Sequence, residues 1–153
     1  MANTYTQIYN HYVFAVQNRL CLIQPKWKND LYKYMTGIIE KQGHKLFEIG
    51  GIADHVHMLV SMSPKQSSSD LMFHTKRSSS LWINENRFVA GKFSWQEGFG
   101  GFSYGKSQIP NIANYIKNQE IHHKKRSFIE EYIEFLKLFD IEYDERYTFK
   151  PIE

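Results

Sequence analysis

The sequence predicts an α+β domain of the ferredoxin-like type, a split βαβ fold with an antiparallel sheet and helices on one face. Three observations favour this class. The apolar pattern changes along the chain in the order strand, helix, strand, strand, helix, strand. The chain has 153 residues, an ordinary length for one domain, and 42% of them are hydrophobic. No repeat or linker divides the sequence, so we expect a single domain over residues 1–153.

The first strand and the first helix are predicted from residue type and spacing. β-Branched and aromatic residues predominate over 8–16, as they do in strands. Apolar residues recur at helical spacing over 26–42, with Pro25 before this segment and Gly43 after it. Proline suits the first turn of a helix and glycine suits its C-terminal end, so both residues support these limits.

A hairpin and a second helix are expected next. Two strands over 45–49 and 55–62 are predicted to pair through a turn at Gly50-Gly51. A loosely apolar helix follows over 68–86, and the serines at its start are suitable N-cap residues. This completes the first five elements of the predicted fold.

The last third of the chain supplies the remaining strand and two more helices. Aromatic and small residues alternate over 93–105, which predicts a short hairpin or a bulged pair of strands whose glycines allow a close backbone approach. Pro110 lies in the first turn of a predicted helix over 108–121. A strongly amphipathic helix runs from Phe128 to Phe139. A helix that follows the last strand can cover the open face of the sheet.

Two histidines in the third predicted strand form a candidate metal site. His55 and His57 flank Val56, and alternation along a strand points both imidazoles to the same side. Such a pair can hold one divalent ion, whereas a lone strand histidine is more often structural. Asp54 precedes the pair and either orients an imidazole or serves as a turn residue.

A phenol and an amide are predicted to meet these histidines. Tyr115 and Gln119 are four residues apart, which places them on one face of the helix over 108–121. Above the open face of the sheet, they would lie beside His55 and His57. Neutral nitrogen and oxygen ligands suit Mg²⁺ or Mn²⁺ acting with a substrate phosphate, and a tyrosine nearby is a candidate nucleophile. The alternative ligands to the amide are His122 and His123.

These motifs together carry a family resemblance. The segment His55 to His57, followed later by Tyr115 to Gln119, resembles the single-tyrosine HUH transposases of small bacterial insertion sequences and their relatives, the REP-associated tyrosine transposases. The two motifs are far more specific together than either is alone. The likeness spans nearly the whole chain, including residues 95–98, 106–108 and 128–147.

The resemblance implies an enzyme that cuts and rejoins single-stranded DNA at hairpin-bearing element ends. It implies His55, His57 and Gln119 as ligands of Mg²⁺ or Mn²⁺. It also implies Tyr115 as the nucleophile that forms a 5′-phosphotyrosine and releases a 3′-hydroxyl. Such relatives are dimers in which the tyrosine helix can complete the partner's site, so a homodimer is expected.

Six cations lie nearest the predicted site along the sequence and are candidates for DNA contacts, although a solvated surface explains each of them equally well. Two of them precede a run of serines that suits either packing or phosphate binding. The aromatic residues Trp95 and Phe102 can stack a base, but core packing is the safer interpretation. The six cations are Lys76, Arg77, Lys106, Lys124, Lys125 and Arg126.

Composition limits the other classes of function. Cys21 is the one cysteine, which excludes an internal disulfide and a thiolate zinc cage. No apolar run is long enough to span a membrane, and no secretory signal is visible, so we expect a cytoplasmic protein with no membrane partner. The net charge of +3 permits a nucleic-acid partner without demonstrating one.

Two alternatives remain open at the level of sequence. A non-catalytic RNA- or DNA-binding ferredoxin-like module would use the histidines as structural residues, but such sheets carry paired aromatics where this sequence has His and Met. A domesticated relative that cleaves host repeat hairpins without mobilising an element has the same motifs as a mobile-element transposase.

Overall fold

The computed structural model describes residues 4–122 and 127–142, apart from the side chain of His122. No helix among these residues combines the length and the apolar character needed to cross a bilayer. The elements, with η denoting a 3-10 helix, are β1 (Tyr9–Ala15), η1 (Gln17–Arg19), α1 (Pro25–Lys41), β2 (Lys45–Ile52), β3 (His55–Ser61), α2 (Ser68–Glu85), β4 (Gly100–Tyr104), η2 (Lys106–Gln108), α3 (Ile109–Lys117), α4 (Gln119–His122) and α5 (Phe128–Leu138).

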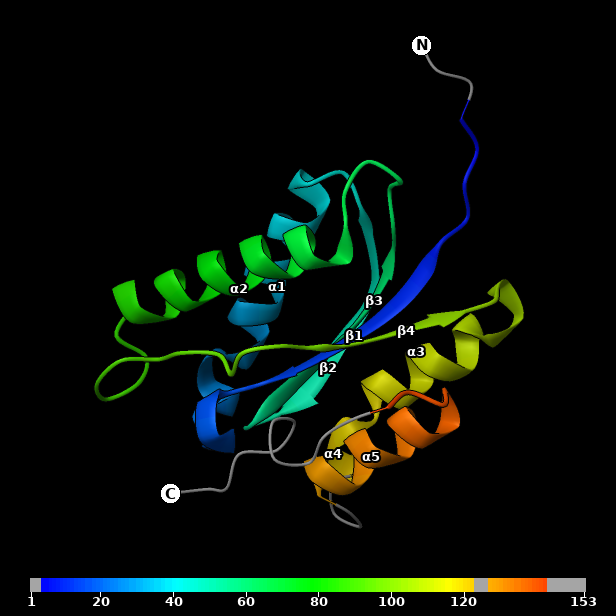
Figure 1. Cartoon of the computed structure of the whole chain (residues 1–153). Coiled ribbons are helices and arrows are strands. Elements are labelled where there is room, and N and C mark those ends of the chain that lie inside the picture. Colours follow the sequence, from blue (N-terminus) through cyan, green and yellow to red (C-terminus); the bar gives the residue numbers. More distant parts are fainter. Residues whose placement is uncertain (1–3, 123–126, 143–153) are drawn as a thin grey trace.

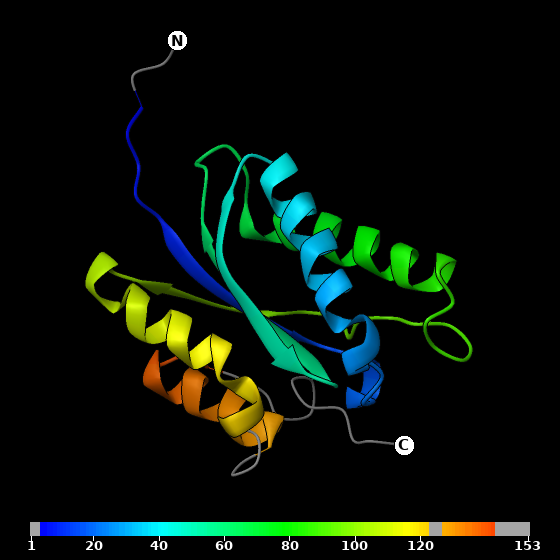
Figure 2. The ribbon, with the colours of Figure 1, turned by 180° about the vertical axis from the view of Figure 1, so that it is seen from behind.

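The strands form one antiparallel sheet in the order β2-β3-β1-β4. With α1 and α2 as the two crossovers, this is the predicted ferredoxin-like split βαβ arrangement. α1 and α2 lie on one face of the sheet, and α3, α4 and α5 lie on the other (Figure 1). The view from behind shows the same layers (Figure 2). The helix that follows the last strand therefore covers the second face, as predicted.

The face under α1 and α2 holds the larger apolar core. α1 buries one residue per turn along a single face. α2 begins after Ser67, whose hydroxyl accepts a hydrogen bond from the Asp70 N–H and so caps the helix. The sheet side chains that are buried on this face are all apolar or aromatic. They are Tyr12, Phe14, Val56, Met58 and Val60.

The opposite face holds a smaller apolar cluster beside the histidines. Phe128 and Leu136 of α5 pack there against Val13 and other sheet residues. Gly100 makes this contact possible, because a Cβ at that position would lie 2.8 Å from Val13 Cγ1 and 3.0 Å from Tyr132 Cε2. The predicted close approach at a glycine of the 93–105 segment is therefore observed here.

The turn predicted at Gly50-Gly51 is wrong, because β2 continues to Ile52 and the chain turns at Ala53-Asp54. Both glycines pair within the ladder, Gly50 opposite His57 and Gly51 opposite Val56. The ladder hydrogen bonds outweigh the low strand propensity of glycine. The absent side chain at Gly50 instead serves the approach of α3, described below.

The hairpin predicted over 93–105 is also wrong, because only β4 forms there. Upstream of β4, this segment adds a single bridge between Trp95 and Val16. Phe93 is fully buried, and its backbone N–H and C=O are both hydrogen-bonded to the Asn84 side chain, so this part of the segment packs on α2 instead of forming the second strand of a hairpin. The aromatic residues considered for base stacking are engaged in packing, with ring centroids 4.8 Å apart for Trp95 and Phe14, and 5.1 Å apart for Phe102 and Phe135.

Candidate active site

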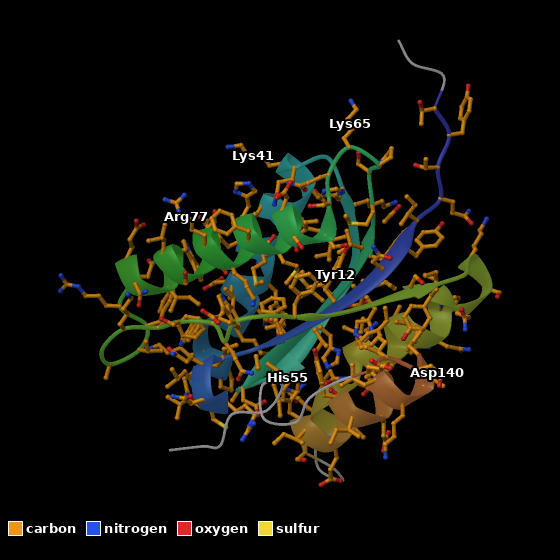
Figure 3. All side chains as sticks on the ribbon, viewed as in Figure 1. Tyr12, Lys41, His55, Lys65, Arg77 and Asp140 are labelled. Carbon is orange, nitrogen blue, oxygen red and sulfur yellow. The ribbon has the colours of Figure 1, made fainter. Side chains whose placement is uncertain are left out.

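His55 and His57 lie on β3 and face the layer of α3, α4 and α5, as predicted from strand alternation. Both side chains are fully buried. Ala15 and Val13 lie across from them on β1. His55 is seen on the side of the sheet away from α1 and α2 (Figure 3). The sheet therefore presents two imidazoles from one strand to the space under α5.

A carboxylate from α5 completes a cluster with the imidazoles. Glu131 Oε1 lies 2.8 Å from His57 Nε2 and 3.5 Å from His55 Nε2. One possible ligand atom from each of these three residues lies within 4.8 Å of the others. Gln119 Oε1 lies 3.1 Å from His55 Nε2 and adds a second oxygen. Imidazole nitrogens and side-chain oxygens at this separation can bind one divalent ion.

Gln119 reaches the cluster where the predicted helix over 108–121 is interrupted. α3 ends at Lys117 and α4 begins at Gln119, and Asn118 between them has φ −101° and ψ 26°. The Gln119 side chain is 1% exposed, and its Nε2 lies 3.3 Å from Glu131 Oε2. The prediction of one continuous helix is therefore wrong, because Asn118 departs from helical dihedral angles and separates α3 from α4.

Tyr115 lies in the last turn of α3, next to the same carboxylate. Its hydroxyl donates a hydrogen bond to Glu131 Oε2, and its ring centroid is 5.9 Å from that of His57. Gly50 explains the closeness, because a Cβ there would lie 2.3 Å from the carbonyl oxygen of Ile116. The bare backbone at Gly50 lets α3 rest on the sheet beside His57, so Tyr115 meets the histidines of its own chain.

The second ring nitrogen of each histidine has its own partner. Asp54 Oδ1 lies 2.7 Å from His55 Nδ1, so Asp54 both occupies the turn and orients an imidazole. His11 Nε2 lies 2.7 Å from His57 Nδ1. Burial lowers the pKa of the His11 imidazole well below its ordinary value, and His57 lowers it further while Glu131 opposes the shift.

The cations predicted to contact DNA do not gather around this cluster in the described part of the chain. Lys76 and Arg77 belong to α2, which lies on the other face of the sheet (Figure 1). Arg77 is labelled on that helix (Figure 3). The Lys76 ammonium group donates hydrogen bonds to the carbonyl oxygens of Gln96 and Gly98, so it is already engaged within the protein. Arg77 and Lys106 are exposed. Lys124, Lys125, Arg126 and His123 lie outside the described residues, as does the side chain of His122.

Sequence analysis did not identify two residues of this region, Glu131 and His11. Glu131 falls on the apolar stripe of α5, between Phe128 and Phe135, and a glutamate in that position was an available signal of a buried polar contact. His11 was not singled out by the sequence pattern, and it shares a strand face with Val13. Its closeness to His57 becomes visible only when the pairing of β1 with β3 is known.

Comparison with known proteins agrees with the geometry. The family described as IS200-like transposases matches residues 4–119, a range that includes His55, His57, Tyr115 and Gln119 and ends before Glu131. The chain is 30% identical over 125 residues to the transposases for insertion sequence element IS200 of Salmonella typhimurium and Salmonella typhi. Each alignment covers 78% of this chain and 81% of the relative.

Solved structures share the fold at low sequence identity. A candidate transposase from Deinococcus radiodurans R1 has a TM-score of 0.61 at 17% identity, covering 78% of this chain and 95% of that protein. A REP-associated tyrosine transposase bound to a REP hairpin has a TM-score of 0.60 at 11% identity, covering 80% of this chain and 73% of that protein. From the matched family and the Salmonella relatives, we conclude that this chain belongs to the IS200-like transposases.

Proposed function

We propose that this chain is a metal-dependent endonuclease and strand transferase that acts on single-stranded DNA during transposition. Its membership of the IS200-like transposases supports DNA transposition as the process. One observation supports this chemistry. The Tyr115 hydroxyl donates a hydrogen bond to Glu131 Oε2, and the other carboxylate oxygen of Glu131 lies 2.8 Å from His57 Nε2. A phenol held beside a cluster of metal-ligand type is arranged to attack a phosphate bound there.

We assign the ion to His55, His57 and Glu131, with Gln119 as a further oxygen donor. The residues fit such an ion because all four side chains are buried and their nitrogen and oxygen atoms converge. The absence of a thiolate from this set, together with its oxygens, favours Mg²⁺ or Mn²⁺. When bound, the ion would polarise the scissile phosphate and stabilise charge on the leaving 3′-oxygen.

Tyr115 is proposed as the nucleophile. Its oxygen forms a bond to phosphorus as the bond from phosphorus to the 3′-oxygen breaks, which leaves a 5′-phosphotyrosine and a free 3′-hydroxyl. The phenol proton leaves toward Glu131 Oε2, its hydrogen-bond acceptor, and the departing 3′-oxygen takes up a proton from water. The covalent link keeps the energy of the broken phosphodiester for rejoining, which strand transfer requires.

Substrate access requires a movement of α5. His55 and His57 are 0% exposed and Glu131 is 1% exposed, so a phosphate cannot reach them in the closed arrangement. α5 covers the cluster, whereas α3 rests on the sheet at Gly50. We therefore expect a limited shift of α5 that admits the phosphate and leaves Glu131 at the cluster, while α3 keeps Tyr115 in place.

The DNA partner is proposed to carry a hairpin. The REP-associated tyrosine transposase of similar fold was solved with a REP hairpin, which supports hairpin-bearing element ends as the substrate class. Phosphate contacts remain proposed for the exposed residues Arg77 and Lys106 and for the undescribed Lys124, Lys125 and Arg126. Lys76 is the weakest candidate, because two carbonyl oxygens already bind its ammonium group. A homodimer is proposed on the family resemblance.

The proposal is tested by incubating the chain with hairpin-bearing single-stranded DNA and Mg²⁺ or Mn²⁺. A covalent protein–DNA adduct that survives denaturing electrophoresis is expected, and EDTA should prevent it. Tyr115→Phe and His57→Ala should each abolish the adduct. Tyr34→Phe is the matched control, because Tyr34 stacks on Trp82 in the other helical layer and should leave the adduct unchanged.

DNA binding without an adduct in the intact chain would overturn the proposal and favour a non-catalytic nucleic-acid-binding module. An adduct that persists in Tyr115→Phe would exclude Tyr115 as the nucleophile. Cleavage without rejoining of strands would favour the domesticated relative that processes host repeat hairpins.

A further inference from the structure

His11 lies next to the proposed metal cluster without being part of it. It is fully buried on β1, and its ring is surrounded by aromatic side chains, with centroid distances of 5.1 Å to Phe135, 5.9 Å to Phe102 and 6.1 Å to Tyr104. Its plane is 24° from that of His57, at a centroid distance of 5.0 Å. The ring is therefore enclosed mainly by aromatic side chains, and one of its edges faces His57.

The polar contact of His11 is directed at one atom. His11 Nε2 lies 2.7 Å from His57 Nδ1, the ring nitrogen of His57 that points away from the cluster. His11 Nδ1 is buried and has no hydrogen-bond partner among the described residues. A side chain needed only for packing would be better apolar at this position, since an unpaired buried nitrogen lowers stability. The contact between His11 Nε2 and His57 therefore accounts for a polar side chain at this position.

Metal binding fixes which nitrogen carries the proton. For His57 Nε2 to offer its lone pair to an ion, the neutral ring must carry its proton on Nδ1. That N–H needs an acceptor, and His11 Nε2 lies within hydrogen-bond distance of it. Asp54 occupies the same place for His55, at 2.7 Å from its Nδ1. The two imidazoles thus have matched supports, a carboxylate for one and a neutral imidazole for the other.

We propose that His11 is a positioning residue that holds His57 in the ring orientation and tautomer required for metal binding through Nε2. This inference rests on the metal site of the proposed function. His11 does not touch the ion or the substrate in this arrangement. It acts by accepting the Nδ1–H of His57, and β1 sets its distance because β1 and β3 are hydrogen-bonded neighbours.

The test is Mn²⁺ titration of the full chain, followed by electron paramagnetic resonance, with two substitutions. His11→Phe keeps an aromatic ring but removes the acceptor, and should weaken Mn²⁺ binding about 10- to 100-fold. His11→Gln can place an amide oxygen near the position of Nε2 and should recover most of that affinity. Urea unfolding of each metal-free variant checks that both are folded.

A spectroscopic measurement gives a readout that does not depend on affinity or activity. Long-range ¹H–¹⁵N correlation spectra of the Mg²⁺-loaded chain should show His57 protonated at Nδ1 in the wild type and in His11→Gln. Wild-type Mn²⁺ affinity in His11→Phe, or a His57 protonated at Nε2 in the Mg²⁺-loaded chain, would overturn the role of His11 while leaving the proposed function intact. A wild-type chain that binds neither ion would overturn both.

Discussion

The two faces of the sheet bury side chains of opposite character along the same strand. On β3, Val56 and Met58 point toward α1 and α2, and His55 and His57 point toward α5. All four side chains are 0% exposed. The first face is stabilised by apolar burial. The second face combines a smaller apolar cluster with hydrogen bonds among imidazoles, a carboxylate, an amide and a phenol.

The difference separates the source of stability from the source of chemistry. Apolar side chains are stabilised when they fill the core without cavities, and their packing depends on shape rather than on the direction of polar atoms. A buried polar cluster contributes little net stability and depends on every partner being in place. Strand alternation therefore lets one β-strand serve both purposes without either face compromising the other.

The largest expected effect comes from breaking the apolar face. Met58→Ala removes a fully buried side chain beside His57 and should lower the free energy of unfolding by about 2–5 kcal/mol. Urea denaturation measures the loss, and the folded variant should still bind Mn²⁺ because His57 faces the other way. Leu138→Ala, at a position 72% exposed, is the control and should change stability by less than about 0.5 kcal/mol. A loss below about 1 kcal/mol for Met58→Ala would contradict the assignment of stability to this face.

A smaller effect is expected from the polar face, at the glycine on which α3 rests. Gly50→Ala places a methyl group 2.3 Å from the Ile116 carbonyl oxygen, which should cost about 1–3 kcal/mol and displace Tyr115 from the cluster. Adduct formation should therefore fall by more than the folded fraction does. Gly37→Ala is the matched control, because a Cβ on that helical residue meets nothing within 4 Å, and it should raise stability by about 0.5–1 kcal/mol. Equal adduct yields in the two variants would disprove the role given to Gly50.

The smallest expected effect concerns the charge of Lys76, which lies on the apolar face of the sheet and changes how stability depends on pH. Burial lowers the pKa of Lys76 to about 8 from the ordinary 10.5, and Glu97 opposes the shift. Between these two values the unfolded chain binds more protons than the folded chain, so this lysine makes the free energy of unfolding rise with pH. Lys76→Met should remove that rise, which we expect to be on the order of 1 kcal/mol for a partly exposed ammonium. Urea denaturation of both proteins between pH 7.5 and 10.5 measures this rise in the free energy of unfolding. If the free energy of unfolding varied with pH in the same way for both proteins, the lowered pKa of Lys76 would be contradicted.

Local pattern was sufficient for most of the fold because its signals lie within short segments. The spacing of apolar residues and the flanking Pro25 and Gly43 predicted α1 closely, and alternation predicted which way His55 and His57 face. Local pattern gave wrong predictions for the turn at Gly50, the hairpin over 93–105 and the continuous helix through Asn118. Contacts from distant segments outweigh local preference at these places. A glycine in a strand and a glycine in a turn look alike until the neighbour that needs the space is known.

The sequence by itself determined the sheet, the paired imidazoles and the family likeness that singled out Tyr115 and Gln119. Only the tertiary structure decided that Glu131 and His11 complete the surroundings of the histidines. The physical reason is that α5 and β1 reach β3 across long stretches of chain, so their contacts depend on strand order and, for α5, on the space left by Gly100. Such contacts leave no periodic trace in the sequence, whereas the faces of helices and strands do.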